Sequence, residues 1–231
     1  MKNPLVTSLL IILILLFQSN PVISQDFSKL QIGIFAGYGK DYYNRKLNGA
    51  GGIPDAKSHF ASKHSIEVGA YGEKFVAHRI SVLVRTYYSN QNVPTNTLCN
   101  CNHLDYLQKE RHHIVSLGLS LRGYLSGRSL VKLVAGLGLQ TEYFLGYSEK
   151  RNDSTRFHGN AQEYNRFNPR VSGEMGLQWK RIGLFGEYKG DLGNTFSKRY
   201  RLSTGGEVRR SIFRHGYSIK LSFLLTKPVS N

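Results

Sequence analysis

After its N-terminal segment, the sequence lacks an apolar run long enough for a membrane-spanning helix, which needs about 20 residues. It also lacks 3.6-residue hydrophobic periodicity of useful length, so the pattern of an amphipathic helical domain is missing. Acidic residues are scarce, with 15 Asp and Glu against 31 Lys and Arg, and cysteine is limited to Cys99 and Cys101. These absences exclude a helical membrane protein and leave no support for a helical globular domain.

The N-terminal segment predicts a secretory signal peptide. A basic residue is followed by a short apolar run from Leu5 to Phe17 and then by small and polar residues up to Ser24. We expect cleavage after Ser24, which gives a signal peptide over residues 1–24 and a single domain over residues 25–231. A retained helical anchor is the alternative, although the run is shorter than a bilayer requires.

The excess of basic residues gives a formal net charge of +16. Such an excess predicts an anionic partner, which could be nucleic acid, phosphorylated lipid or acidic polysaccharide. For an exported chain the last two are favoured, and we expect no nucleic acid.

What the sequence contains instead is alternation of apolar and polar residues with a period of two, the pattern of half-buried strands. Residues 130–144, LVKLVAGLGLQTEYF, show it most clearly. We predict eight such strands, at residues 29–38, 64–74, 79–89, 112–125, 130–144, 167–180, 182–190 and 211–226.

The links between these strands alternate in length. Short links are expected at residues 75–78, 126–129 and 180–181, and long ones at residues 39–63, 90–111, 145–166 and 191–210. Short periplasmic turns, long extracellular loops and an even number of strands are typical of bacterial outer-membrane barrels. A soluble sandwich or lipocalin-like barrel has no reason to alternate so regularly.

Alternation alone does not decide which face is outside, because a soluble barrel would turn the same apolar face inward. Glycine placement favours a membrane barrel, since small residues on the charged face make room for long side chains inside a narrow barrel. These glycines are Gly33, Gly37, Gly69, Gly118, Gly136, Gly138, Gly176, Gly183 and Gly216. Aromatic residues favour it too, because they fall on the apolar face at strand ends, as an interfacial girdle does. They are Tyr38, Tyr88, Tyr143, Tyr188, Phe167, Phe213 and Trp179.

The opposite face predicts a charged barrel interior. Buried charges must be paired, and we expect Glu67 to pair with Arg85 and Glu142 with Arg170. The full expected network contains Glu67, Arg85, Glu142, Arg170, Glu174 and Lys220, together with Glu73, Glu187, Arg122, Lys132, Lys189 and Arg214. An eight-stranded barrel encloses little more than its own side chains, so we predict a plugged interior, with a narrow ion path as the alternative.

No catalytic or metal-binding motif is complete. Cys99 and Cys101 lie in a predicted loop with His103 nearby, but zinc sites use other spacings, so a disulfide or loop clip is favoured. Of the neighbouring His112 and His113, one is expected in the aromatic girdle and the other in the loop. Ser211 and His215 could form a nucleophile and base, but no third, orienting group is apparent.

Two of the long loops are basic and are candidate ligand-binding segments. They carry Arg45 and Lys46 in the first loop and Lys198, Arg199 and Arg201 in the last. Guanidinium groups suit the phosphates of lipid A and anionic glycans. Simple solubility and contact with lipid headgroups form the alternative explanation.

The glycine-rich strand KLQIGIFAGYGK (29–40), the closing strand YSIKLSFLLTK (217–227) and the alternating loops resemble small outer-membrane β-barrel proteins. The resemblance is to the OmpA/OmpX-like barrel and to the outer-membrane β-barrel domain families abundant in Bacteroidetes. It implies an exported, porin-like barrel in the envelope of a Gram-negative cell.

The sequence therefore predicts an all-β, eight-stranded antiparallel transmembrane barrel in the bacterial outer membrane. We expect a non-enzymatic structural or surface-interaction role, with basic extracellular loops that engage an anionic partner. The expected partners are outer-membrane lipid and lipopolysaccharide, an anionic glycan or a protein, and no cofactor or metal is expected. Alternatives are a narrow transport component, a lipid-modifying enzyme of the outer membrane and a soluble exported barrel.

Overall fold

A computed structural model describes residues 30–49, 56–61, 64–77, 79–94, 109–125, 130–151, 154–158, 165–193, 196–201 and 207–226, and these form β-strands and short connections. The expected signal peptide lies outside the described residues. Eight strands are paired in a ring: β1 (Leu30–Gly49), β3 (His64–Ala77), β4 (Ile80–Pro94), β5 (Lys109–Tyr124), β6 (Val131–Arg151), β8 (Phe167–Trp179), β9 (Ile182–Asp191) and β11 (Glu207–Leu224).

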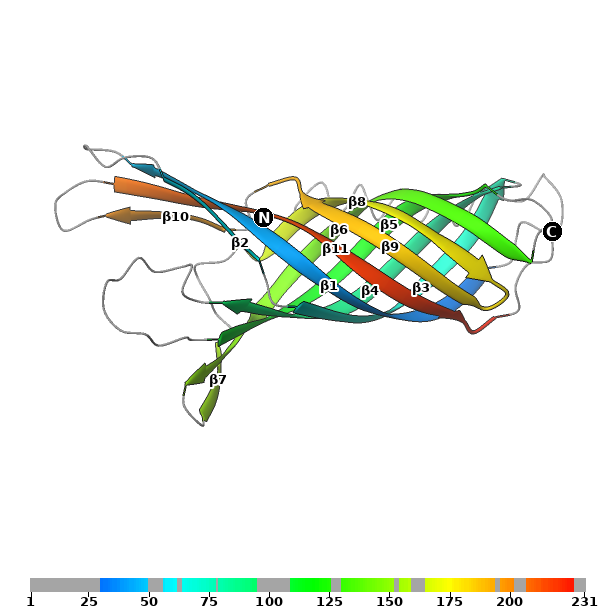
Figure 1. The fold of residues 1–231 in the computed structure, drawn as a ribbon, viewed down its shortest axis with the longest axis horizontal. Helices are drawn as coiled ribbons and strands as arrows, with labels where there is room; N and C mark the ends of the chain where they lie inside the picture. The colour runs from blue at the N-terminus through cyan, green and yellow to red at the C-terminus, as the bar shows by residue number, and fades with distance from the viewer. Residues whose placement is uncertain are drawn as a thin grey trace, which may run out of the picture.

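The ring is a closed antiparallel barrel (Figure 1). Each strand pairs with the next strand of the ring, and β11 pairs with β1 from Gly33↔Leu224 to Gly49↔Val208. Closure leaves no unpaired sheet edge in the wall, which a bilayer requires because lipid cannot hydrogen-bond the backbone. The predicted fold class and strand number are confirmed.

The strands extend further at one end than the sequence predicts. β1 continues to Gly49, β6 continues to Arg151 and β11 begins at Glu207, while three short strands pair with these extended ends. The short strands are β2 (Ala56–Ala61), β7 (Ser154–His158) and β10 (Phe196–Arg201). All three fall in segments predicted as loops, because hydrophobic alternation stops where the wall leaves the lipid while backbone pairing continues.

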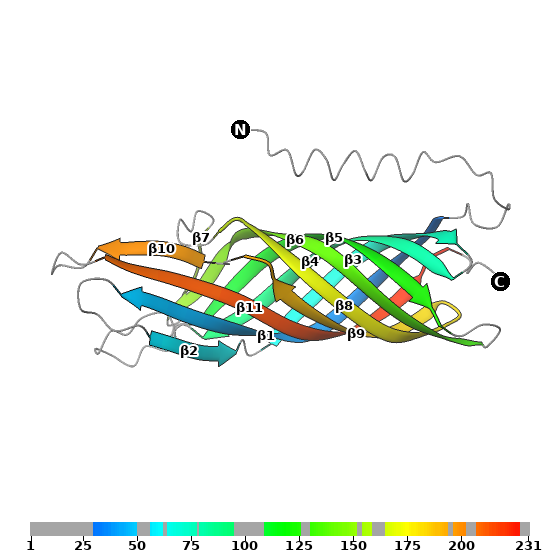
Figure 2. The same ribbon diagram turned by 90° about the horizontal axis from the view of Figure 1, so that it is seen from above.

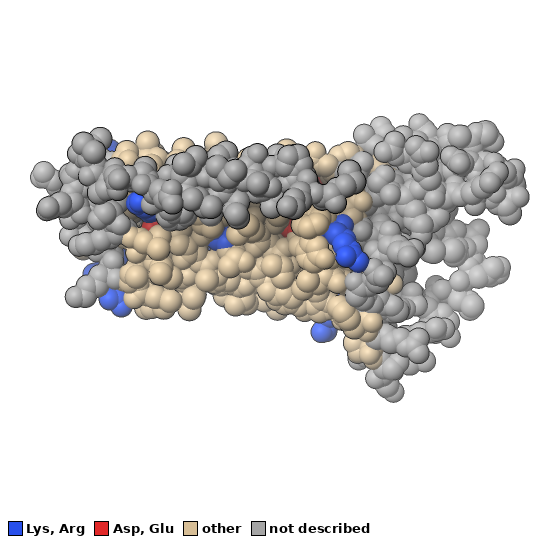
Figure 3. Space-filling view, turned by 180° about the vertical axis from the view of Figure 1, so that it is seen from behind, with Lys and Arg blue, Asp and Glu red and all other residues tan. Residues whose placement is uncertain are grey.

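The wall has its apolar face outside. Along β9, Leu184 and Tyr188 are more than half exposed, whereas Glu187 and Lys189 are almost fully buried. In a space-filling view, the visible wall between the two ends consists mostly of uncharged residues, with Lys and Arg near the ends (Figure 3). A soluble barrel has the reverse arrangement, with its apolar face inside. Apolar residues outside and charged residues inside suit a lipid environment. No helix among the described residues is long and apolar enough to cross a membrane.

The predicted girdle residues all lie on the outer face. Tyr38, Phe167 and Tyr188 are more than half exposed, and Trp179 at the opposite end is nearly so. Tyr143 contacts Phe167 on the neighbouring strand, with ring centroids 5.0 Å apart. Aromatic rings near both rims match the interfacial belts of membrane barrels.

Glycines on the inner face are required by packing. A Cβ on Gly176 would lie 2.8 Å from the Cα of Phe185, and one on Gly138 would lie 2.8 Å from the carbonyl oxygen of Leu119. Backbone atoms cannot move away as a flexible side chain can. Gly176 and Gly138 therefore let neighbouring strands approach closely. The expectation that inward glycines make room for long side chains is confirmed at Gly118 and Gly37, where a Cβ would lie 3.0 Å from Nε of Arg85 and 3.1 Å from Cγ of Lys220.

Candidate functional site

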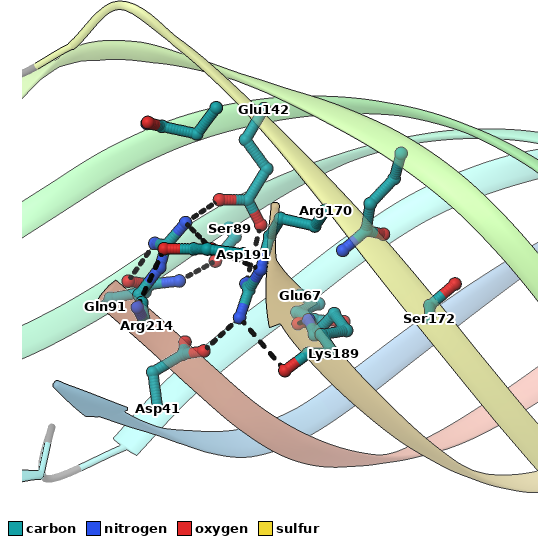
Figure 4. Close-up of polar contacts among 12 residues, drawn as sticks. Asp41, Glu67, Ser89, Gln91, Glu142, Arg170, Ser172, Lys189, Asp191 and Arg214 are labelled. Carbon is teal, nitrogen blue, oxygen red and sulfur yellow. Dashed lines mark hydrogen bonds and ion pairs between the residues drawn. The ribbon is translucent and has the colours of Figure 1, made fainter. Parts of the chain in front are cut away.

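The outer end of the barrel interior holds a cluster of ion pairs built around Arg170 (Figure 4). Its guanidinium contacts Glu142 at 2.9 Å, Asp191 at 2.9 Å and Asp41 at 3.1 Å. Arg214 binds the second oxygen of Glu142 and lies 3.7 Å from Asp191. Because Arg170 is fully buried and its charge is shared among three carboxylates, the cluster ties β1, β6, β8, β9 and β11 together.

A second cluster occupies the middle of the barrel. The ammonium of Lys189 binds Glu67, and that of Lys220 contacts Glu187 at 2.5 Å and Glu67 at 3.4 Å. Arg85 binds the other oxygen of Glu187. Each carboxylate is therefore held by two cations, which offsets much of the desolvation that burial imposes on both signs of charge.

The ring of Tyr87 lies between the two lysines of this cluster. Lys220 is 5.0 Å and Lys189 is 5.4 Å from its centroid, and its hydroxyl donates to Gln140 at 3.0 Å. Cation–π contacts with a desolvated ring add to the ion pairs.

The third cluster lies nearer the periplasmic end. Arg122 forms a two-pronged contact with Glu174, at 2.6 Å through Nε and 3.2 Å through Nη2, and reaches Glu73 at 3.3 Å. Glu73 also accepts a hydrogen bond of 2.6 Å from Tyr124. Below it, an apolar cluster of Phe75, Tyr124, Val134 and Phe185 fills the lumen.

These clusters fill the barrel. Among the described residues, the acids with buried side chains are Asp41, Glu67, Glu73, Glu142, Glu174, Glu187 and Asp191, and the buried bases are Arg85, Arg122, Arg170, Lys189, Arg214 and Lys220. An interior cavity of about 20 Å³ beside Arg85, Arg122 and Lys220 has room for roughly one water molecule. The geometry agrees with a plugged interior.

The structure places Glu67, Arg85, Glu142, Arg170, Glu174 and Lys220 inside the barrel, and it pairs Glu142 with Arg170 as expected. The expected pairing of Glu67 with Arg85 is wrong. Among the described contacts, Glu67 binds Lys189 and Lys220, and Arg85 binds Glu187 and Glu174. Nearest-strand reasoning failed because long side chains cross the lumen to strands opposite. Lys132, also expected inside, is only half buried, with its ammonium 5.8 Å from the ring of Tyr124.

Sequence reasoning missed Asp41 and Asp191, which it assigned to loops. Both continue the inward alternation of their strands, Asp41 in β1 and Asp191 in β9. If the alternation of the predicted strands had been continued past their ends through a few polar residues, it would have placed both acids on the inward face. Their burial also removes two acids from the segments predicted as extracellular loops, which makes the remaining parts more basic.

Beyond the barrel rim, four strands continue as a sheet in the order β2, β1, β11 and β10 (Figure 2). We call β2, β10, residues 45–49 of β1 and residues 207–211 of β11 the basic extension. In it, Lys198 is the direct partner of Arg210, Arg199 of Arg209, and Lys46 of Lys57. Its bases are Arg45, Lys46, Lys57, Lys198, Arg199, Arg201, Arg209 and Arg210, and its one acid is Glu207. Arg45, Lys46, Lys198, Arg199 and Arg201, which were predicted in two separate loops, thus belong to one sheet.

The other candidate residues are dispersed. Cys99 and Cys101 lie outside the described residues. His113 faces outward beside Tyr88, as a girdle residue. The other histidine, His112, is not in a loop, because it lies on the inward face of β5 and is buried against Phe144.

No catalytic or metal-binding arrangement is found in the described part of the chain. His215 stacks on Tyr42 and contacts Asn44, and no described carboxylate orients its ring. Among the same residues, no group of three or more His, Cys, Asp or Glu could hold a metal ion.

No family model matches the chain, and no curated protein matches its sequence. Solved structures do match its fold. The outer membrane protein OprG of Pseudomonas aeruginosa is 12% identical over 84% of this chain and 96% of its own, with a TM-score of 0.45. Ail of Yersinia pestis, in complex with the heparin analogue sucrose octasulfate, is 10% identical over 80% of this chain and 98% of its own, with a TM-score of 0.30.

An enzyme is also among the similar structures. The outer membrane protease OmpT of Escherichia coli is 9% identical over 84% of this chain and 97% of its own, with a TM-score of 0.35. The closed wall, its apolar exterior and its charged interior give this chain the fold of the small eight-stranded barrels of the bacterial outer membrane.

Proposed function

We propose that the protein is a non-enzymatic surface barrel whose basic extension binds an anionic glycan outside the outer membrane. The supporting observation is the register of the extension. Lys198 and Arg210, Arg199 and Arg209, and Lys46 and Lys57 are direct cross-strand partners. Residues directly opposite in a sheet have Cβ atoms about 5 Å apart, and like charges there are destabilising.

A multivalent anion would relieve this repulsion. Sulfate and phosphate groups accept hydrogen bonds from two cations at once, and guanidinium groups match their geometry. A chain of sugars with regularly spaced anionic groups could contact several of these pairs together. The plugged interior, by contrast, gives no wide path for a transported solute.

The experiment compares glycan binding by the refolded barrel and by the triple variant Lys198→Gln, Arg199→Gln and Arg201→Gln. Calorimetric titration in detergent micelles would use heparin fragments, sucrose octasulfate and a phosphorylated core oligosaccharide without lipid. Removing three cations should weaken binding about tenfold at low salt, because each exposed pair contributes up to about 1 kcal/mol. Binding by the unchanged barrel should fall steeply as salt is added.

The matched control removes three cations at the periplasmic end, as Arg79→Gln, Lys180→Gln and Arg181→Gln. All three side chains are exposed, and none is in the basic extension. If both triple variants weakened glycan binding equally, the effect would come from net charge alone and not from the basic extension. Unchanged binding by the first triple would contradict the proposal.

A further inference from the structure

The lipid-facing wall carries an apolar groove of about 880 Å³. It runs obliquely from Ile80, at the periplasmic end of β4, across β5, β6 and β8 to Tyr188 and Tyr217. Tyr188 lies three residues before the outer end of β9, so the groove climbs toward the side of the long loops.

Small residues on the outer face deepen this groove. Ala135, Gly173 and Gly186 line it between larger side chains such as Leu137 and Met175. A Cβ on Gly186 would come no nearer than 3.8 Å to another atom, and one on Gly173 no nearer than 3.6 Å. Unlike the inward glycines, these are not required by the packing of the protein, so the space they leave lies on the lipid side.

The upper end of the groove adjoins a polar cluster on the same face. Tyr217, which lines the groove, lies 3.4 Å from Tyr42 through their hydroxyl groups. His215 stacks on Tyr42 with ring centroids 5.5 Å apart, and Tyr188 lies 6.3 Å from His215. The ammonium of Lys40 is 5.7 Å from the ring of Tyr42. We call Lys40, Tyr42, Tyr188, His215 and Tyr217 the rim cluster.

The rim cluster presents hydrogen-bond donors and the positive charge of Lys40 on the outer face. Among the described residues, no ion pair joins Lys40 or His215 to a carboxylate, and the neighbouring Asp41 points into the barrel. The amide nitrogen of Asn44 lies 3.4 Å from Nδ1 of His215 and can only donate. In the tautomer in which Nδ1 accepts this hydrogen bond, Nε2 carries the ring proton and can donate it to an anion.

We propose that the groove and the rim cluster form a site for one phosphorylated glycolipid of the outer leaflet. An acyl chain occupies the groove, and a headgroup phosphate lies between Lys40 and His215. The apolar lining fits a hydrocarbon chain, and the ammonium of Lys40 with the ring N–H of His215 fits a phosphate at headgroup depth. The site lies on the wall, uses none of the residues of the basic extension, and does not depend on the glycan function proposed above.

Native mass spectrometry of the refolded barrel in detergent tests the site with defined lipids. The probes are diphosphorylated lipid A and the same lipid with its phosphates removed. The phosphorylated form should bind at least about tenfold more tightly, because charge-assisted hydrogen bonds are roughly twice as strong as neutral ones. Equal binding of the two lipids, or binding of neither, would overturn the proposal without any variant.

Variants then separate the two parts of the site. Lys40→Gln with His215→Gln should abolish the preference for the phosphorylated lipid and leave binding of the dephosphorylated lipid unchanged. Gly186→Leu should fill the groove and weaken both lipids about equally. If Gly186→Leu bound both lipids as the unchanged barrel does, the groove would not be the acyl site.

Matched controls lie on the same lipid-facing surface, away from the site. Gly72→Leu adds a side chain at an outward glycine of a different strand, β3. Lys74→Gln removes an outward cation near the periplasmic end of the same strand. Neither should alter lipid binding, and an equal effect in these controls would contradict the proposal. The Lys198, Arg199 and Arg201 triple variant should retain lipid binding, so failure of the glycan function and failure of the lipid site give different results.

Discussion

Glu142 joins the two guanidinium groups of the outer cluster. One of its oxygens accepts from Arg170 at 2.9 Å and the other from Arg214, and all three side chains are almost fully buried. Removing a buried carboxylate leaves two guanidinium groups with fewer partners, which costs more than the pair itself contributes.

Glu142→Gln is therefore expected to lower the free energy of unfolding by about 3–5 kcal/mol. Urea-induced unfolding in lipid vesicles measures it. In a double-mutant cycle, Glu142→Gln and Arg170→Met should couple by about 1–3 kcal/mol, because they share one contact.

The control cycle combines Glu142→Gln with Arg122→Met, whose described contacts lie in the third cluster. These two changes should add within about 0.5 kcal/mol. Additivity in the Glu142 and Arg170 cycle would show that their contact contributes little to stability.

At the scale of elements, one of the periplasmic links is the two-residue turn Lys180-Arg181 between β8 and β9. Trp179 and Ile182 are direct partners, so the turn begins immediately after the ladder ends. Lys180 has a φ of 50°, in the left-handed region, which costs roughly 1–2 kcal/mol for a residue with a Cβ. Two-residue hairpin loops commonly place glycine in such a conformation.

Lys180→Gly should therefore stabilise the barrel by up to about 1 kcal/mol. The urea midpoint in vesicles measures the gain. Arg181→Gly is the matched control, because Arg181 does not have a positive φ and glycine there should give no gain. A decrease in stability for Lys180→Gly would mean that the lysine side chain stabilises the turn by more than its left-handed backbone conformation costs.

At the scale of the whole molecule, the interior of the barrel is filled by side chains, so binding of a ligand is expected on the outer surface. The lumen is filled by three charged clusters above an apolar cluster of Phe75, Tyr124, Val134 and Phe185. Ligand recognition is therefore expected on the basic extension and the wall, outside the filled lumen.

The unchanged barrel should show no steady porin-sized conductance in a planar bilayer, because charged and apolar side chains fill the described interior and the cavity beside Arg85, Arg122 and Lys220 has room for about one water molecule. Truncating the side chains of both Arg85 and Glu187 to Ala removes an ion pair from the middle of the plug. At equal protein load, that variant should conduct measurably more than the unchanged barrel, which serves as the control. A steady large conductance of the unchanged barrel would favour the transport alternative.

Much of this architecture was readable from the sequence. Period-two alternation predicted eight strands, the alternation of short and long links predicted their arrangement, and glycines and aromatic rings predicted the polarity of the wall. These signals are strong because lipid penalises every polar group on the outer face, so the membrane-spanning segments have little freedom in composition.

The sequence alone could not predict the partners inside the barrel or the surfaces outside it. Arg85 binds Glu187 and Glu174, and Glu67 binds Lys189, because closure brings side chains from opposite strands together across the lumen. The basic extension arises because β2 and β10 pair with the outer ends of β1 and β11, where polar composition gives no alternation. Local chemistry therefore determined the strands and their faces, whereas closure of the barrel decided which charges meet.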